Sequence, residues 1–143
     1  MKKKEKKGEE FERISKCLLE EYLKEELEIQ KKVEIGLSIK KEHKFDFGNS
    51  DYLVECKAYD WTKGKNTPSG KISTLKETLL YFLLAPKSYK KVLVLKKSKI
   101  KNSETLLDYF IRLNRYLISD DLMFFEIDEE NSTIENKSIK ERE

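Results

Sequence analysis

The sequence predicts an α/β fold in which a mixed central sheet is flanked by helices, in the order αβββαβαβ. Apolar residues recur every three to four positions in three separate segments, which indicates helices, and short alternating or wholly apolar runs indicate strands. The first three strands follow one another without a helix, so they are expected to form a meander before helix–strand crossovers begin. With 143 residues, the chain has the length of one domain.

The first half of the chain contains one helix and three strands. The helix is expected from about Glu9 to Glu28, with an apolar stripe of Phe11, Ile14, Leu18, Leu19, Tyr22, Leu23 and Leu27. Residues 33–39, 45–47 and 52–59 alternate between polar and apolar, as half-buried strands do. Gly48-Asn49 is a turn signal, so the second and third strands should pair antiparallel.

The second half alternates helices and strands. A polar loop is expected from Thr62 to Gly70, and the helix after it from about Lys71 to Pro86, because proline ends a helix. The remaining elements are a strand covered on both faces at 92–95, a helix at 104–118 and a strand at 122–127. We expect residues 1–8 to be a basic, flexible leader, 9–128 to be one domain and 129–143 to be a charged, frayed tail.

Composition narrows the class of protein. The 38% apolar content with 10% aromatic residues indicates a globular body, and the net charge of +3 permits a polyanionic partner without requiring one. No apolar run is long enough to cross a bilayer and no signal peptide is visible, so we expect a cytoplasmic protein without a membrane partner. Cys17 and Cys56 are expected to be reduced core thiols, and with His43 they cannot form a tetrahedral zinc site.

Three charged residues are expected to converge on the sheet. Glu55 and Lys57 lie two apart on one strand, so their side chains leave the same face, while Val54, Cys56 and Ala58 take the other. Asp46 lies one strand earlier between Phe45 and Phe47 and should point away from the surface that those rings bury. Charged side chains in the middle of an inner strand are costly unless they face a polar cleft or each other.

This set of residues is suited to phosphodiester hydrolysis. Mg²⁺ takes oxygen ligands, and Asp46 and Glu55 supply carboxylates to which the carbonyl of Cys56 could add a third oxygen. Lys57 would position or activate the attacking water and balance charge on the phosphate. The alternative is an ordinary Glu–Lys ion pair on a solvated sheet face. His43 has no evident partner for base chemistry and is interpreted as a structural strand residue.

The motif Phe45-Asp46, eight residues, then Glu55-Cys56-Lys57 resembles that of the PD-(D/E)xK nuclease superfamily, with its restriction-endonuclease-like fold. The run from Lys7 to Arg13 also looks like the first helix of the archaeal Holliday-junction resolvases in that superfamily. By that likeness Glu12 assists the metal site, with Glu9 as a rival one turn earlier. Phe45 replaces the usual proline, a substitution that the family tolerates.

The resemblance implies a magnesium-dependent endonuclease that cuts DNA rather than RNA, with Mn²⁺ as a possible substitute. A single site cuts one strand, so symmetric cleavage would call for a homodimer. Candidate nucleic-acid contacts are Trp61 and Lys63 in the loop after the catalytic strand, and Lys71 and Lys76 on the next helix. The alternatives are a core anchor for Trp61 and an ordinary solvated helix face for the two helix lysines. The alternative is a non-catalytic member of the same fold that binds nucleic acid or serves as a complex subunit.

Overall fold

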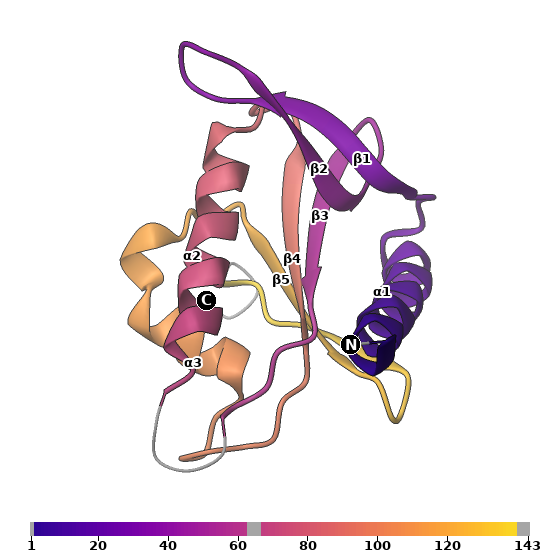
Figure 1. The fold of residues 1–143 in the computed structure, drawn as a ribbon, viewed down its shortest axis with the longest axis vertical. Coiled ribbons are helices and arrows are strands. Elements are labelled where there is room, and N and C mark those ends of the chain that lie inside the picture. Colours follow the sequence, from indigo (N-terminus) through magenta and orange to yellow (C-terminus); the bar gives the residue numbers. More distant parts are fainter. Residues whose placement is uncertain (1, 63–66, 140–143) are drawn as a thin grey trace.

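The computed structural model describes residues 2–62 and 67–139. A six-stranded mixed sheet separates helix α1 from helices α2 and α3, which cover its other face (Figure 1). The strands are β1 (Glu28–Ile35), β2 (Lys41–Gly48), β3 (Tyr52–Lys57), β4 (Lys90–Lys96), β5 (Met123–Asp128) and β6 (Thr133–Asn136). The helices are α1 (Lys2–Leu23), α2 (Ser69–Leu84), α3 (Leu106–Leu113) and the short 3₁₀ helix η1 (Arg115–Leu117). The expected α/β class is confirmed.

The strands lie in the sheet in the order in which they occur in the chain. β1, β2 and β3 form an antiparallel meander, β3, β4 and β5 are parallel, and β6 returns antiparallel to β5. The two parallel connections run through α2 and α3, as such connections require a crossover. The carboxyl ends of β3, β4 and β5 therefore lie at the same end of the sheet.

The sheet has a separate apolar core on each face. On the α1 face the core includes Phe11, Leu19, Val54, Cys56, Val94 and Phe125. On the α2 and α3 face it includes Phe45, Leu53, Leu75, Phe82, Leu93 and Phe110. Val54 and Leu53 are neighbours in β3 and belong to opposite cores, because side chains alternate along a strand. Val92, Leu93, Val94 and Leu95 are all fully buried, which confirms that this run is covered on both faces.

Helix α1 begins and ends earlier than expected. It is helical from Lys2, so it includes residues that we expected to form a flexible leader, and it stops at Leu23, where Lys24 has a positive φ of 57°. Leu27 is buried but lies outside the helix, and β1 starts at Glu28. The apolar stripe alone did not locate this end, because Leu27 keeps the helical spacing after the backbone has left the helix.

The cysteine prediction was wrong for Cys17. Between residues 8 and 23 of α1, the buried side chains are Phe11, Ser15 and Leu19, spaced by four residues. Cys17 lies off this stripe and is exposed, whereas Cys56 is buried, and both are free thiols. Spacing by four places one side chain above another on a helix, so a residue two positions away faces elsewhere.

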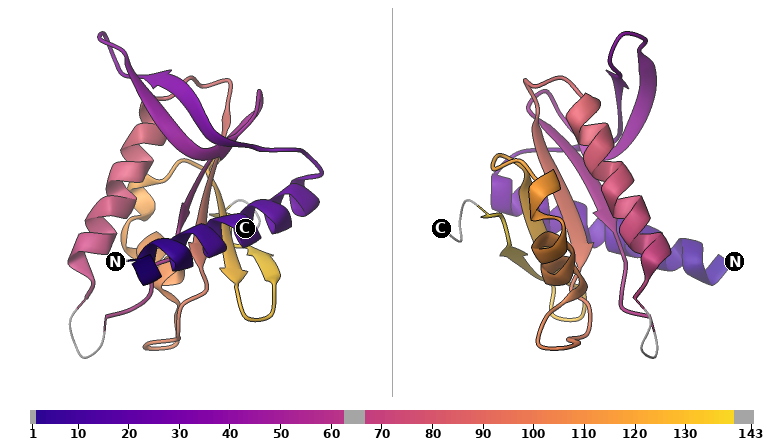
Figure 2. Two further views of the ribbon diagram at one scale, coloured as in Figure 1. Left: turned by 45° about the vertical axis from the view of Figure 1, so that its right-hand side comes forward. Right: turned by 90° about the vertical axis from the view of Figure 1, so that its left-hand side faces the viewer.

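The β1–β2 hairpin extends beyond the rest of the sheet (Figure 2). Its turn starts at Gly36, which has a φ of +137° that glycine adopts readily and other residues rarely do. A Cβ at this position would also collide with the carbonyl oxygen of Ile39. Leu37 and Ile39 were expected in a strand, but they form the hairpin tip and are 84% and 88% exposed. The prediction was wrong because Leu37 and Ile39 alternate with small or polar residues, so the pattern of a strand continues into the turn.

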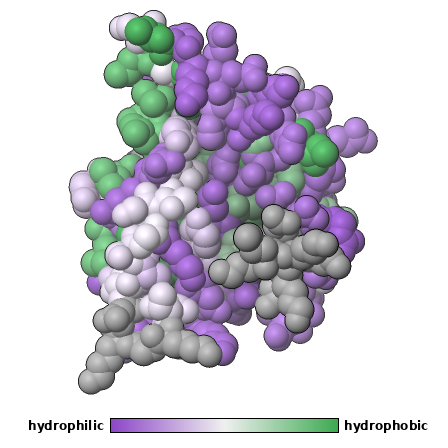
Figure 3. Space-filling model, in the orientation of Figure 1, coloured by the Kyte–Doolittle hydropathy of each residue, from purple (hydrophilic) through white to green (hydrophobic). Residues whose placement is uncertain are grey.

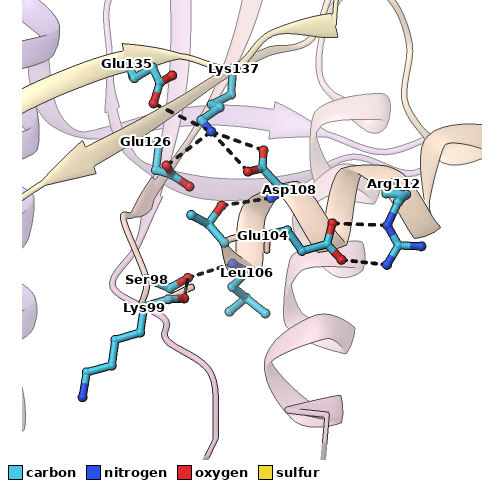
Figure 4. Close-up of polar contacts among 10 residues, drawn as sticks. Ser98, Lys99, Glu104, Leu106, Asp108, Arg112, Glu126, Glu135 and Lys137 are labelled. Atoms are coloured by element: carbon cyan, nitrogen blue, oxygen red, sulfur yellow. Dashed lines mark hydrogen bonds and ion pairs between the residues drawn. The ribbon is translucent and has the colours of Figure 1, made fainter. Parts of the chain in front are cut away.

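The expected frayed tail is partly a strand. β6 pairs with β5 in the register Ile127↔Ile134, and Ile139 beyond it is buried. Lys137 follows β6 and reaches three carboxylates, with Nζ 3.2 Å from Asp108, 3.6 Å from Glu126 and 3.7 Å from Glu135 (Figure 4). Charge content suggested a solvated tail, but here the charges pair with charges on α3 and β5 and hold the strand in place.

Within residues 2–62 and 67–139, none of the helices combines the length and the apolar character that a membrane crossing needs.

Candidate active site

Glu55 and Lys57 lie side by side on β3, on the face that carries α2. Lys57 Nζ is 3.8 Å from Glu55 Oε2. Glu55 lies in an inner strand and is only 6% exposed. Val54 and Cys56 point into the core on the α1 face. The expected alternation is confirmed for Val54 and Cys56 but was wrong for Ala58, which is exposed because β3 ends at Lys57. The charged pair occupies the end of β3 where the parallel strands terminate.

Asp46 lies where β2 separates from β3. The β2–β3 ladder contains only the pairs Phe47↔Val54 and Gly48↔Leu53, whereas β2 stays paired with β1 as far as Lys41. At the next position Asp46 Oδ2 accepts a hydrogen bond of 2.8 Å from the backbone N–H of Cys56. The side chain thus takes over a contact that the backbone of a continuous β2–β3 ladder would otherwise make.

The two rings beside Asp46 do not share one surface. Phe47 belongs to the core on the α1 face, while Phe45 belongs to the core on the α2 face and stacks on Phe82 with ring centroids 5.6 Å apart. The expected common face was wrong: β2 leaves its pairing with β3 between Phe47 and Phe45, and these two side chains pack into opposite cores. Asp46 is half-buried between the two cores.

Glu55 is the most perturbed carboxyl of this group. Its pKa is raised from 4.5 to about 8, first by burial and then by the negative charge of Asp46, while Lys57 opposes both. Glu55 Oε1 is buried and has no hydrogen-bond partner in the described part of the chain. Lys57 therefore offsets the burial of this carboxyl only in part, and perturbation of this kind is typical of functional sites.

Glu12 reaches the same region from α1. Its pKa is raised, first by burial, then by the charge of Asp46, with Lys57 opposing. Glu12 is half-buried whereas Glu9, the rival, is exposed. The electrostatic influence of Asp46 and Lys57 on Glu12 favours it over Glu9 as the helix residue that faces the site.

Two further residues of the site are Cys56 and His43. Burial, and then the charges of Asp46 and Glu12, raise the pKa of the Cys56 thiol well above its usual value of 9.0, so this thiol stays protonated in the core. His43 was interpreted as a structural residue without a partner, but its Nε2 is 3.5 Å from Glu55 Oε1. Its ring lies against Tyr81 of α2, with centroids 4.4 Å apart, and burial lowers its pKa. The sequence placed His43 in a strand but did not predict this contact, because the contact depends on how β2, β3 and α2 pack together.

The residues expected to contact nucleic acid lie in different places. Lys71 is close to the loop after β3, since its Nζ donates a 3.0 Å hydrogen bond to the carbonyl of Asp60. Lys76 instead lines an apolar groove on the outer side of α2, away from Glu55. Trp61 contacts Tyr109 of α3, with ring centroids 5.0 Å apart. Lys63 lies outside the described residues.

The residues present fit a divalent metal such as Mg²⁺. Asp46 and Glu55 offer carboxylate oxygens, and Oε1 of Glu55 makes no hydrogen bond within the described part of the chain. A cation would offset the repulsion that contributes to the raised pKa of Glu55. In the described part of the chain, no three His, Cys, Asp or Glu side chains form a metal-binding group. Mg²⁺ commonly uses only one or two carboxylates and completes its shell with water and phosphate oxygens.

Comparisons with family models, with curated proteins and with solved structures found no match. The fold and the site thus define an α/β protein with a carboxylate–lysine cluster where two sheet strands separate.

Asp46→Ala is expected to be less stable than Asp46→Asn by about 1–3 kcal/mol, because alanine leaves the buried N–H of Cys56 without an acceptor and asparagine keeps an oxygen there. Chemical denaturation of the two variants measures the difference. As a control, Asp51→Ala and Asp51→Asn, in the exposed turn between β2 and β3, should differ by less. Equal stability of the two Asp46 variants would mean that water can replace the carboxylate as an acceptor.

Proposed function

We propose that the protein is a metal-dependent endonuclease that hydrolyses DNA phosphodiester bonds, of the PD-(D/E)xK type with its restriction-endonuclease-like fold. The observation that carries the proposal is the buried carboxyl of Glu55, with a pKa of about 8, beside Asp46 and Lys57. A buried acid next to a second acid is costly for stability alone. A function that needs both carboxylates explains why they lie together.

Each residue of the site has a distinct role in this proposal. Asp46 and Glu55 hold Mg²⁺, and the carbonyl of Cys56 is a further candidate ligand. When bound, the metal supplies Lewis acidity for a phosphate oxygen and lowers the pKa of a bound water. Lys57, whose ammonium already lies 3.8 Å from Glu55, orients the water and stabilises negative charge on the phosphate. Glu12 supports the site from α1.

The substrate is proposed to be DNA, with Mn²⁺ as a substitute metal. Lys71 beside the loop after β3 would contact the phosphate backbone, which positions a strand without reading its sequence. Lys63 in the same loop remains a proposed contact from the sequence. A homodimer would present two such sites for symmetric cleavage.

The test is magnesium-dependent cleavage of supercoiled plasmid, single-stranded DNA, branched junctions and RNA. The wild type is expected to cut at least one DNA substrate, chelator should abolish cutting, and Lys57→Ala should reduce the rate by about 10²–10³-fold, the usual effect of losing one group that stabilises transition-state charge. Lys87→Ala is the matched control, because Lys87 is an exposed lysine that precedes β4, at the opposite end of the sheet from Lys57. If no substrate is cut with Mg²⁺ or Mn²⁺ and calorimetry detects no metal, the nuclease proposal fails.

A specific observation favours the alternative of a non-catalytic complex subunit. The groove lined by Lys76, Leu80, Leu83 and Leu117 holds about 630 Å³, and Leu83 is 76% exposed. Figure 3 shows hydrophobic surface on the side of the molecule that carries α2 in Figure 1. Apolar surface of this kind is typical of a protein–protein contact. Under this alternative nucleic acid or a partner protein binds without metal, and nothing is turned over.

A further inference from the structure

A second pocket lies beyond the carboxyl ends of β3 and β4. The segments that leave these two strands run to the same end of the molecule before they enter α2 and α3 (Figure 1). Residues that line the pocket include Trp61, Lys101, Asn102, Glu104, Tyr109 and Arg112, and it holds about 340 Å³. This is close to the lower limit of about 300 Å³ for small-ligand sites.

The pocket combines aromatic rings with cations. Trp61 and Tyr109 meet edge to face, with their ring planes inclined by 68°. Lys101 Nζ lies 5.5 Å from the centroid of the Trp61 ring, and Arg112 Cζ lies 5.6 Å from that of Tyr109. Aromatic faces with nearby positive charges are what an unpaired base and its phosphate need for binding, because the base stacks and the phosphate is neutralised.

Polar groups at the pocket can add direction to such stacking. Glu104 holds Arg112 by two hydrogen bonds of 2.7 and 3.2 Å, which fixes the guanidinium plane beside Tyr109. The indole Nε1 of Trp61 is buried and has no hydrogen-bond partner in the described part of the chain. A nucleobase offers ring nitrogens and carbonyl oxygens as acceptors, so it can satisfy a donor of this kind.

The pocket lies a short length of chain from the candidate active site. Asp60 Oδ1 accepts hydrogen bonds from the backbone N–H of Trp61, at 2.8 Å, and from that of Lys99, at 3.1 Å, which ties the segment after β3 to the segment after β4. From Lys57 to Trp61 the chain can span at most about 14 Å. That is about four nucleotide steps of a stacked strand, at about 3.4 Å each.

We propose that this pocket binds an unpaired base of the DNA substrate, stacked against Trp61 and Tyr109, within a few nucleotides of the phosphate that is cut. The inference rests on the proposed nuclease function and adds a substrate class to it, namely DNA with single-stranded character beside the cleavage position. A fully paired duplex keeps its bases stacked on one another and offers none to the pocket.

The test uses intrinsic fluorescence, because Trp61 is the only tryptophan in the chain. Wild-type protein in chelator, where cleavage is blocked, is titrated with a blunt DNA duplex and with the same duplex carrying a single-stranded oligothymidine extension. The extended duplex is expected to quench the fluorescence of Trp61, and the blunt duplex is expected to leave it nearly unchanged. An equal response to both duplexes, or no response at saturation, overturns the inference.

Variants test the same point by affinity. Tyr109→Leu and Trp61→Leu are expected to bind the labelled extended duplex about 5- to 150-fold more weakly, the range for loss of one base–aromatic stack. Tyr116→Leu, on η1 and 78% exposed, is the control and should bind as the wild type does. Melting temperatures verify folding, and Tyr109→Leu keeps the fluorescent reporter. Unchanged affinity of a folded Tyr109→Leu variant overturns the inference.

The outcomes separate this inference from the proposed function. Cleavage of DNA by a wild type whose Trp61 fluorescence does not respond would leave the nuclease and remove the base pocket. Quenching by the extended duplex, without cleavage in Mg²⁺ or Mn²⁺, would leave a single-strand-binding pocket and remove the nuclease.

Discussion

Glu55→Gln is expected to abolish DNA cleavage and at the same time to stabilise the fold. Loss of a carboxylate that holds the metal should lower the cleavage rate by at least about 10²–10³-fold. The pKa of Glu55 is raised from 4.5 to about 8, so at pH 7 folding must bring a proton onto a carboxyl that is ionised in the unfolded chain. The difference of 2.5 units between pH 7 and 4.5 corresponds to at most about 3 kcal/mol, which glutamine does not incur because it is neutral in both states.

The sign of the pH dependence follows from the raised pKa. Between pH 4.5 and about 8 the folded protein binds more protons at Glu55 than the unfolded chain does, so this residue lowers stability progressively as the pH rises. The difference in unfolding free energy between Glu55→Gln and the wild type should therefore be small near pH 4 and largest above pH 8. Chemical denaturation in chelator across this range measures it, and Mg²⁺ should narrow the gap by stabilising only the wild type.

Glu34→Gln is the matched control for Glu55→Gln. Glu34 is an exposed glutamate on β1, so its substitution should change neither cleavage nor the pH profile of stability. If Glu55→Gln is instead less stable than the wild type at every pH, the pair of Glu55 and Lys57 is a structural ion pair, and the proposed site is wrong.

Lys137→Met is expected to destabilise the protein by about 3–5 kcal/mol at neutral pH, the usual effect of removing one partner from a buried ion pair. Lys137 Nζ is 3.6 Å from the carboxylate of Glu126, which is only 2% exposed (Figure 4). Burial raises the pKa of Glu126, and the Thr105 hydroxyl and Lys137 oppose it. Burial lowers the pKa of Lys137, but the charges of Glu126, Asp108 and Glu135 outweigh it and leave that pKa raised.

Denaturation of Lys137→Met beside two comparison variants tests this role. Lys32→Met, at an exposed position of β1, should change the unfolding free energy by less than about 0.5 kcal/mol. Adding Glu126→Gln to Lys137→Met should recover much of the loss, because no buried charge then lacks a partner. If Lys137→Met is as mild as Lys32→Met, the contacts of Lys137 are those of a solvated surface cluster.

Much of the architecture could be predicted from local patterns. Periodicities of a few residues predicted the central strand at 92–95 and the helix before Pro86. They also predicted that Glu55 and Lys57 lie on the same face of their strand. The contact between Asp46 and the Glu55 strand followed from the short turn after Gly48, since a tight turn leaves two strands little choice of register.

The features that were missed depend on distant parts of the chain. β6 pairs with β5, and Lys137 after it pairs with carboxylates on α3 and β5, which are close only in the folded protein. His43 meets Glu55 because β2 extends beyond its apolar residues through its pairing with β1.

The sequence by itself thus determined the class of fold and the two acids and the lysine of the candidate site, since those rest on spacing along the chain. Only the tertiary structure decided three further features: the separation of β2 from β3 at Asp46, the approach of Glu12 from α1 and the pairing of Trp61 with Tyr109. The physical reason is that side-chain direction follows from local backbone geometry, whereas burial, pKa and contact depend on what the rest of the chain packs against it.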